Sequence, residues 1–311
     1  MELLTRVPIS NSAHPIDYSS KVLVLGSCFA EHIGGKLGYY QFRSLLNPFG
    51  IIYQPQAIYE IVRRSLEKDH FTGDDLFFLN ERWHCFAVHS DLSHTDKDTL
   101  LRNLNGALDE TAAYIKKATH LLITLGTAWV YRYKRTGKLV ANCHKVPQRE
   151  FRKELLTQPV IAGYLEQLAQ LVRKVNPGLQ IVYTVSPVRH LRDGFTENQR
   201  SKAHLIAAVH TLKGATYFPS YELMMDELRD YRFYGPDMVH PNEIAINYIW
   251  ERFKASSVAA GAYPVMEQVE AVRRGKAHRP YNPNSQAHRS FLQSLEQKIT
   301  DLKRSYPFME F

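Results

Sequence analysis

The chain has little cysteine and lacks the short motifs that bind metals or nucleotides. Its three cysteines, Cys28, Cys85 and Cys143, are an odd number at wide spacing, which favours reduced thiols over a disulfide framework or a zinc site. There is no Cys-x-x-Cys, His-Glu-x-x-His, glycine-rich phosphate loop or dinucleotide fingerprint. The sequence therefore predicts a protein that uses no metal ion and no other cofactor.

Long apolar runs are also missing. No apolar stretch of the sequence is long enough to cross a bilayer, and the first residues do not resemble a secretion signal. We therefore expect a cytoplasmic protein that has no membrane partner. The formal charge of +8 is spread along the chain in short clusters, which favours an acidic substrate over nucleic acid. The sequence makes no prediction of oligomeric state.

Apolar strand-like runs at 22–25, 120–125 and 179–185 alternate with helix-like segments at 55–66, 98–117 and 161–175. This alternation predicts an α/β fold with a parallel sheet. Two hairpin patterns, at 76–88 and 130–141, are expected as insertions over the strand ends. A breaker cluster at 280–284 precedes apolar residues at helical spacing. We therefore predict a main domain over 1–260 and a helical C-terminal extension over 261–311.

The most informative stretch is the first apolar run, which ends in Gly26 and Ser27. A buried parallel strand that ends in this way delivers a hydroxyl to the carboxyl edge of the sheet, where open α/β sheets bind ligands. Ser27 is therefore a candidate nucleophile. The alternative is an ordinary turn after a strand. Cys28 follows directly at a helix start, where a thiol pKa falls, but we interpret it as a structural residue that packs under the helix.

Asp237 and His240 lie near the other end of the main domain, just before a helix-like run at 243–253. At this spacing the carboxylate can hold one imidazole nitrogen while the other points outward. Such an oriented base can take the proton of a serine, which is a poor nucleophile without one. The alternative for Asp-x-x-His is a helix cap beside a surface histidine.

The letters Gly-Ser-Cys-Phe-Ala at 26–30 resemble the signature of the GSCFA family, a branch of the SGNH (GDSL-like) hydrolase superfamily. The superfamily order also matches, with the serine first, a strand followed by glycine in between, and Asp-x-x-His last. Further similar segments lie at 47–50, 124–127, 142–145, 185–188 and 237–242. The resemblance covers about residues 20 to 255. It implies a three-layer α/β/α fold.

The resemblance implies a role for each matching residue. Ser27 would be the nucleophile, His240 the base and Asp237 the carboxylate that orients it. The backbone amides of Ser27 and Gly50 would form part of an oxyanion hole. The superfamily usually adds an asparagine after the third block, where this chain has Thr127. Thr127 could take its place through its hydroxyl, and Asn142 or His144 could reach in from the hairpin that follows.

Other residues are predicted to contact the substrate. The resemblance points to Asn47, and to Asn142 and His144 in the hairpin that follows the second long strand. Arg189 and His190, with Arg192 nearby, follow the third strand and can receive an anionic or sugar-like group. A solvated basic loop is the alternative for these last residues.

These observations favour an ester hydrolase or O-acyltransferase that works through an acyl-Ser27 intermediate. Superfamily analogy suggests an O-acylated carbohydrate as the substrate. One alternative is a non-catalytic binding protein on the same fold, because the usual asparagine is missing. The other is a protein that binds a partner or nucleic acid through its basic C-terminal tail.

Overall fold

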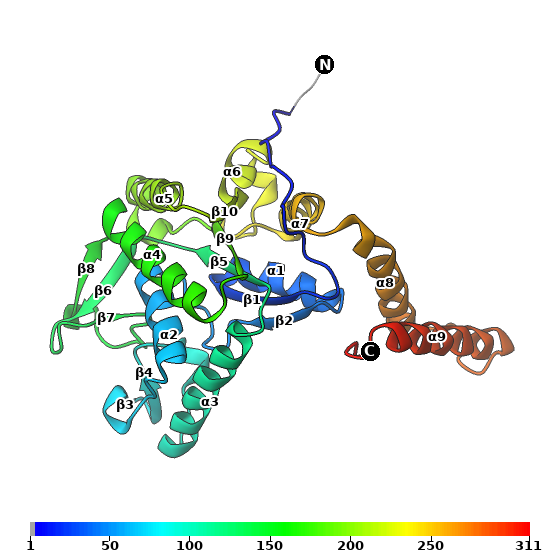
Figure 1. Ribbon diagram of the computed structural model, residues 1–311, viewed down its shortest axis with the longest axis horizontal. Helices are drawn as coiled ribbons and strands as arrows, with labels where there is room; N and C mark the ends of the chain where they lie inside the picture. The colour runs from blue at the N-terminus through cyan, green and yellow to red at the C-terminus, as the bar shows by residue number, and fades with distance from the viewer. Residues whose placement is uncertain (1–3) are drawn as a thin grey trace.

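The computed structural model describes residues 4–311, whose centre is a parallel sheet (Figure 1). Five parallel strands lie in the order β10-β9-β5-β1-β2. The three inner strands are β1 (Lys21–Gly26), β5 (His120–Leu125) and β9 (Gln180–Val185). They correspond to the three apolar runs, so the predicted α/β fold is confirmed. The outer strands β2 (Arg43–Leu46) and β10 (Thr216–Phe218) were not predicted.

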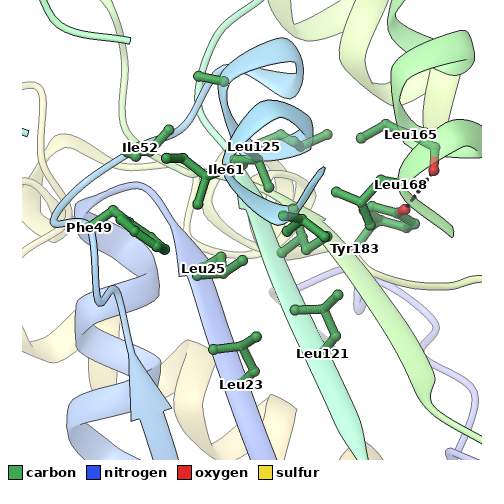
Figure 2. Close-up of a cluster of buried hydrophobic side chains, with 14 of the residues drawn as sticks. Leu23, Leu25, Phe49, Ile52, Ile61, Leu121, Leu125, Leu165, Leu168 and Tyr183 are labelled. Carbon is green, nitrogen blue, oxygen red and sulfur yellow. Dashed lines mark hydrogen bonds between the residues drawn. The ribbon is translucent and has the colours of Figure 1, made fainter. Parts of the chain in front are cut away.

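Side chains alternate along the inner strands between two hydrophobic clusters, one on each face of the sheet. Leu23 and Leu25 of β1 join one cluster with Tyr183 of β9 (Figure 2). Val22 and Val24 join the other cluster. The first cluster also contains side chains of α2 (Pro55–Glu67), α3 (Lys97–Ile115), α4 (Gln158–Val175) and α5 (Phe195–Val209). The second contains side chains of α1 (Cys28–Tyr39) and α7 (Glu243–Ser257). Helices thus cover both faces, as the three-layer prediction requires.

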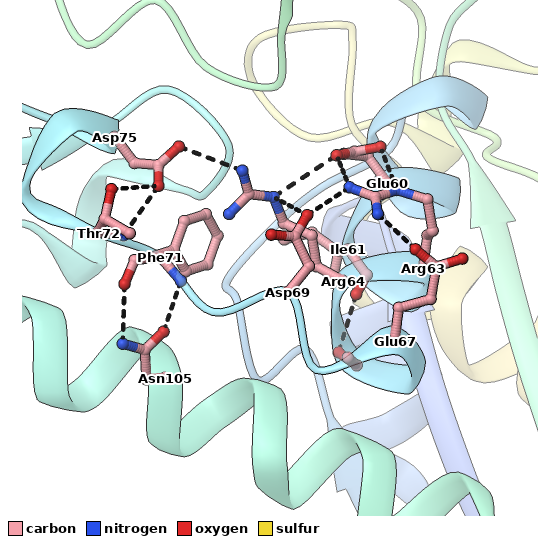
Figure 3. Close-up of polar contacts among 11 residues, drawn as sticks. Glu60, Ile61, Arg63, Arg64, Glu67, Asp69, Phe71, Thr72, Asp75 and Asn105 are labelled. Carbon is pink, nitrogen blue, oxygen red and sulfur yellow. Dashed lines mark hydrogen bonds and ion pairs between the residues drawn. The ribbon is translucent and has the colours of Figure 1, made fainter.

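Polar contacts fix the loop between α2 and the first hairpin (Figure 3). The guanidinium of Arg64 lies 4.4 Å from the Phe71 ring centroid and pairs with Asp75 at 3.2 Å. Asn105 of α3 accepts the Phe71 amide at 2.8 Å and donates to the Phe71 carbonyl at 3.0 Å. The neighbouring Arg63 pairs with three carboxylates, those of Glu60, Glu67 and Asp69. The segment that leads into the hairpin is therefore held by contacts with both α2 and α3.

Two antiparallel insertions interrupt the α/β pattern. The first is the hairpin of β3 (Leu76–Leu79) and β4 (Arg82–Cys85). The second follows β5 and has β6 (Trp129–Tyr133) between β7 (Leu139–Val140) and β8 (Phe151–Leu155). Both predicted hairpins are confirmed, and β8 is an additional strand. The second insertion forms part of the candidate site.

The C-terminal part consists of α8 (Tyr263–Ala277) and α9 (Gln286–Ser305). Leu295, Ile299 and Leu302 of α9 are buried in the same cluster as α1 and α7. The chain end returns to β2, where the Arg43 guanidinium lies 4.6 Å from the Phe308 ring centroid. The C-terminal helical part therefore packs on the body. No helix within 4–311 is long and apolar enough to cross a membrane.

Replacing Gly26 by alanine should strongly destabilise the fold. Gly26 has a φ of 143°, and a Cβ there would lie 2.3 Å from the Thr124 carbonyl oxygen. Backbone strain and overpacking together should lower the free energy of unfolding by about 2–5 kcal/mol, measured by urea denaturation. Gly106→Ala in α3 is the control, because its Cβ would meet open space and the change should add up to about 1 kcal/mol. Equal stability of Gly26→Ala and the wild type would contradict this account.

Candidate active site

Ser27 follows β1, at the point where the order of strands in the sheet reverses. β1 has β2 on one side and β5 on the other, and such switch points are where doubly wound sheets bind ligands. Ser27 is the N-cap of α1, and its Oγ accepts the Phe29 amide at 3.3 Å. The residue is only 2% exposed. The hydroxyl is therefore held at the carboxyl edge of the sheet, and its proton is still available to a base.

Asp237 and His240 form the oriented pair that their spacing predicts. Asp237 Oδ2 lies 2.6 Å from His240 Nδ1. Asp237 Oδ1 accepts the backbone amides of Val239 at 2.9 Å and of His240 at 3.0 Å. The amide and ring of His240, with the Val239 amide, lower the pKa of Asp237 to about 2. An ionised carboxylate at Nδ1 favours the tautomer with its proton on Nδ1, which leaves Nε2 as an acceptor.

The loop that carries this pair is held by Arg189. The Arg189 amide donates to the Val239 carbonyl at 3.2 Å, and its Nη1 donates to the Met238 carbonyl at 3.3 Å. Met238 has a φ of 54°, a conformation that non-glycine residues seldom adopt. Arg189 was predicted to bind substrate. The structure shows that it also positions the loop between Asp237 and His240.

Ser27, Asp237 and His240 line one cleft of about 690 Å³, together with Thr127, Asn142, Arg189 and His190. Within residues 4–311 the Ser27 hydroxyl and the His240 ring share this cleft without a hydrogen bond between them. Catalytic hydrogen bonds often tighten only when substrate binds. In the same part of the chain, no cluster of three or more His, Cys, Asp or Glu residues is placed to hold a metal ion.

The residues predicted for the oxyanion hole are mostly engaged elsewhere. The Ser27 amide donates to the Thr124 carbonyl at 3.2 Å, and the Gly50 amide donates to the Asn47 carbonyl at 2.8 Å. The Thr127 hydroxyl lies in the cleft but accepts the amide of Trp129 at 3.1 Å; it also lies 2.8 Å from the Ser201 hydroxyl. Gly50 and Asn47 line a separate small cavity. The side chain of Asn47 accepts the Gly26 amide at 2.9 Å, so its visible role is to hold the end of β1.

Asn142 and His144 were both predicted to contact the substrate, but only Asn142 lines the cleft. His144 is buried outside the cleft, and its Nε2 lies 2.7 Å from the Cys85 carbonyl oxygen. Burial lowers the His144 pKa to about 4. Asn142 lines the cleft, and its Oδ1 accepts the His144 amide at 2.8 Å. The Asn142 Nδ2 has no partner among the described residues, so it remains a free donor.

His190 and Cys28 line the cleft in their neutral forms. Burial, with the charges of Lys202 and His240, lowers the His190 pKa to about 3, and the ring lies 5.5 Å from that of Tyr53. His190 therefore offers no positive charge to an anionic substrate at neutral pH. Burial raises the Cys28 pKa, which supports its interpretation as a structural thiol.

Lys202 is a residue whose importance sequence reasoning missed. It is fully buried on α5, and its Nζ donates to the carbonyls of Gly126 at 2.8 Å and Ser186 at 2.7 Å. These carbonyls follow β5 and β9, so one ammonium joins two strand ends beneath the cleft. One signal in the sequence could have revealed its burial: Lys202 lies on the same helix face as the core residue Leu205. The aromatic cleft walls Tyr53, Trp129 and Tyr131 were also missed.

The fold and site define a class: a three-layer α/β protein with a serine and an Asp–His pair in one cleft at the carboxyl edge of its sheet. The chain matches the model of the GSCFA family over residues 21–253. It therefore belongs to the GSCFA family, and Ser27, Asp237 and His240 all lie within the matched range. A second model, the GSCFA domain protein C-terminal domain, matches residues 269–311. No curated protein matches the chain.

The buried ammonium of Lys202 predicts a specific pH dependence of stability. Burial lowers its pKa to about 7, against about 10.4 in an unfolded chain. Below pH 7 both states are charged and the burial cost is present in full. Between about pH 7 and 10 the unfolded state binds more protons, so the free energy of unfolding should rise by on the order of 2–4 kcal/mol.

Urea denaturation at pH 6, 7.5 and 9 measures this rise, which Lys202→Met should abolish. Lys116→Met, at an exposed helix end, is the matched control and should retain the wild-type pH dependence. Parallel stability curves for Lys202→Met and the wild type would show that Lys202 does not titrate in this range.

Proposed function

We propose that this protein is an SGNH-type serine hydrolase that cleaves esters, or transfers their acyl group, through an acyl-Ser27 intermediate. The observation that carries the proposal is that Ser27, at the end of β1, and His240, oriented by Asp237, line the same cleft. The order of the motifs and the three-layer fold support the link to the SGNH superfamily. Residues from opposite ends of the main domain thus meet as nucleophile and base.

In the proposed mechanism His240 acts first as a general base and then as a general acid. Its Nε2 takes the Ser27 proton while the Ser27 oxygen attacks the ester carbonyl carbon, and the carbonyl electrons move to the oxygen. When the tetrahedral intermediate collapses, the bond to the alcohol oxygen breaks and Nε2 returns the proton to that oxygen. Water or an acceptor hydroxyl then repeats these steps on the acyl-serine. Asp237 remains ionised and stabilises the imidazolium.

Two groups serve the oxyanion best, the Cys28 amide and the side chain of Asn142, which the sequence had already suggested. The Cys28 amide is the first of α1 and donates to no other described residue. A helix N-terminus stabilises negative charge. Asn142 Nδ2 is also free and lines the cleft with Cys28. We therefore assign the Cys28 amide and the Asn142 side chain to the oxyanion hole, in place of Gly50 and Thr127.

An acylated carbohydrate remains the proposed substrate class. The cleft walls include Trp129 and Tyr131 beside polar Gln148 and Arg192. Aromatic faces beside hydrogen-bonding side chains suit a ring that carries hydroxyl groups. We also propose a cytoplasmic location, which the free thiols of Cys28, Cys85 and Cys143 support.

A non-catalytic binding protein is the second candidate. It is favoured by the capping bond on the Ser27 hydroxyl and by the engaged amides of Ser27 and Gly50. On this alternative the cleft would bind an ester or sugar without turning it over. Covalent labelling of the serine separates the two candidates.

A fluorophosphonate should label wild-type protein at Ser27, because His240 activates this hydroxyl. Mass spectrometry of the labelled peptide measures the site, and Ser27→Ala should remain unlabelled. The same pair of proteins is then assayed on short-chain and sugar acetyl esters, where Ser27→Ala should lose all detectable turnover. Absent labelling together with equal rates would reject the nucleophile and favour the binding protein.

Asp237→Asn should keep the fold and lose most of the activity. The amide cannot stabilise the imidazolium, and it favours the tautomer that places the proton on Nε2. Loss of kcat should be about a hundredfold to ten-thousandfold, measured on the best ester found above. Asp96→Asn is the control, because its carboxylate also accepts a backbone amide, that of Thr99 at 2.7 Å, but at the start of α3 and away from the cleft. A rate within threefold of wild type for Asp237→Asn would show that His240 does not depend on this carboxylate.

A further inference from the structure

A second pocket of about 280 Å³ adjoins the active-site cleft. Arg189 and Leu191 line both cavities, so the two lie next to each other at the loop after β9. The pocket walls come from this loop, the start of α5, the π-helical turn Leu223–Glu227 and the segment before α7. Its apolar lining consists of Leu191, Phe195, Met224, Met225, Tyr231 and Tyr234.

The polar side chains of this pocket are already engaged within the protein. Asn198 Oδ1 accepts a backbone amide at 2.9 Å, and Gln199 Oε1 accepts the Tyr221 hydroxyl at 2.6 Å. Arg229 and Asp230 each form an ion pair with a neighbouring side chain, at 3.1 Å in both cases. The surface left for a ligand is therefore mainly apolar, in contrast to the polar cleft beside Ser27.

Two aromatic rings of the pocket are strongly exposed. Phe195 is 66% exposed and Tyr231 is 63% exposed. Together with Tyr234 they surround the Arg189 guanidinium, whose carbon lies 5.4, 5.6 and 5.2 Å from the ring centroids of Phe195, Tyr231 and Tyr234. Because Arg189 also holds Met238, this wall is fixed to the catalytic loop. Exposed apolar surface that is fixed beside a reactive site is typical of a binding surface.

We propose that this pocket binds the hydrocarbon chain of the ester substrate. The inference rests on the proposed ester chemistry and adds the kind of group that the substrate carries. A volume of about 280 Å³ holds roughly eight or nine methylene groups, each about as large as a water molecule in the liquid. A methylene that is completely buried should raise kcat/KM about fourfold, and one that stays partly exposed in this open pocket should raise it less. The chain can belong to the acyl group or to the alcohol, and the test separates these sources.

The test compares methyl octanoate, octyl acetate and ethyl acetate as substrates of the full chain. One of the two long esters should show kcat/KM at least tenfold above ethyl acetate, which identifies the acyl or the alcohol side. The double variant Phe195→Ala/Tyr231→Ala should reduce that long-to-short ratio about tenfold. Phe78→Ala removes an equally exposed ring from β3, at 57% exposure, and should leave the ratio unchanged. Ratios near one, or a ratio that the double variant leaves intact, overturn the inference.

A binding measurement separates failure of this inference from failure of the proposed function. Ser27→Ala, which cannot turn over, is titrated with both long esters by calorimetry. Affinity should fall at least fivefold when Phe195→Ala/Tyr231→Ala is added. If wild type hydrolyses no ester but this dependence is present, only the proposed catalysis fails. If the affinity is the same without the two rings, the pocket inference fails even where Ser27-dependent hydrolysis is observed.

Discussion

The close packing of Gly26 against β5 is the constraint on which the site depends. A side chain at this position would meet the Thr124 backbone, and the Gly26 amide is held by Asn47. The next amide, that of Ser27, donates to Thr124 as well. This contact places the Ser27 hydroxyl at the N-terminus of α1, but it also engages the amide that would otherwise face an oxyanion. In the proposed mechanism the donors are therefore the amide of the next residue, Cys28, and the Asn142 side chain in the insertion after β5.

Burial and hydrogen bonding decide which groups around Ser27 carry charge. Burial lowers the pKa of His190 to about 3 and leaves it neutral, while hydrogen bonds from His240 and Val239 lower the pKa of Asp237 to about 2 and leave it ionised. The Arg189 guanidinium donates to the Met238 carbonyl and packs against the Tyr234 ring. Of the basic residues first considered for an anionic substrate, only Arg192 stays exposed at the cleft. The electrostatics therefore suit a neutral ester whose charge develops during reaction.

Much of the fold and of the candidate site could be predicted because both depend on local patterns. The inner strands are buried on both faces and so read as continuous apolar runs. Ser27 directly follows such a strand, and Asp237 and His240 lie just before α7, at a spacing that the sequence shows. By contrast β2 and β10 are short edge strands, and β8 has exposed charged residues, so none has a distinctive pattern. The hydrogen bonds from Lys202 to Gly126 and Ser186 join separate segments of the chain, and no spacing rule in the sequence reveals them.

The C-terminal helices contact the two helices that begin next to Ser27 and His240, the proposed nucleophile and base. Figure 1 shows α8 and α9 extending from α7, away from the insertions. The Tyr263 hydroxyl of α8 donates to the Lys254 carbonyl of α7 at 3.0 Å, and Arg273 donates to the Gly38 carbonyl of α1 at 3.2 Å.

These two helices are also joined directly, because Lys36 of α1 donates to Asn247 of α7 at 2.6 Å. α1 starts after Ser27 and α7 starts shortly after His240, so their relative position sets the distance between the proposed nucleophile and base. The C-terminal helices share a hydrophobic cluster with both. The segment that matches the second family model therefore helps to fix α1 and α7, and with them Ser27 and His240, relative to one another.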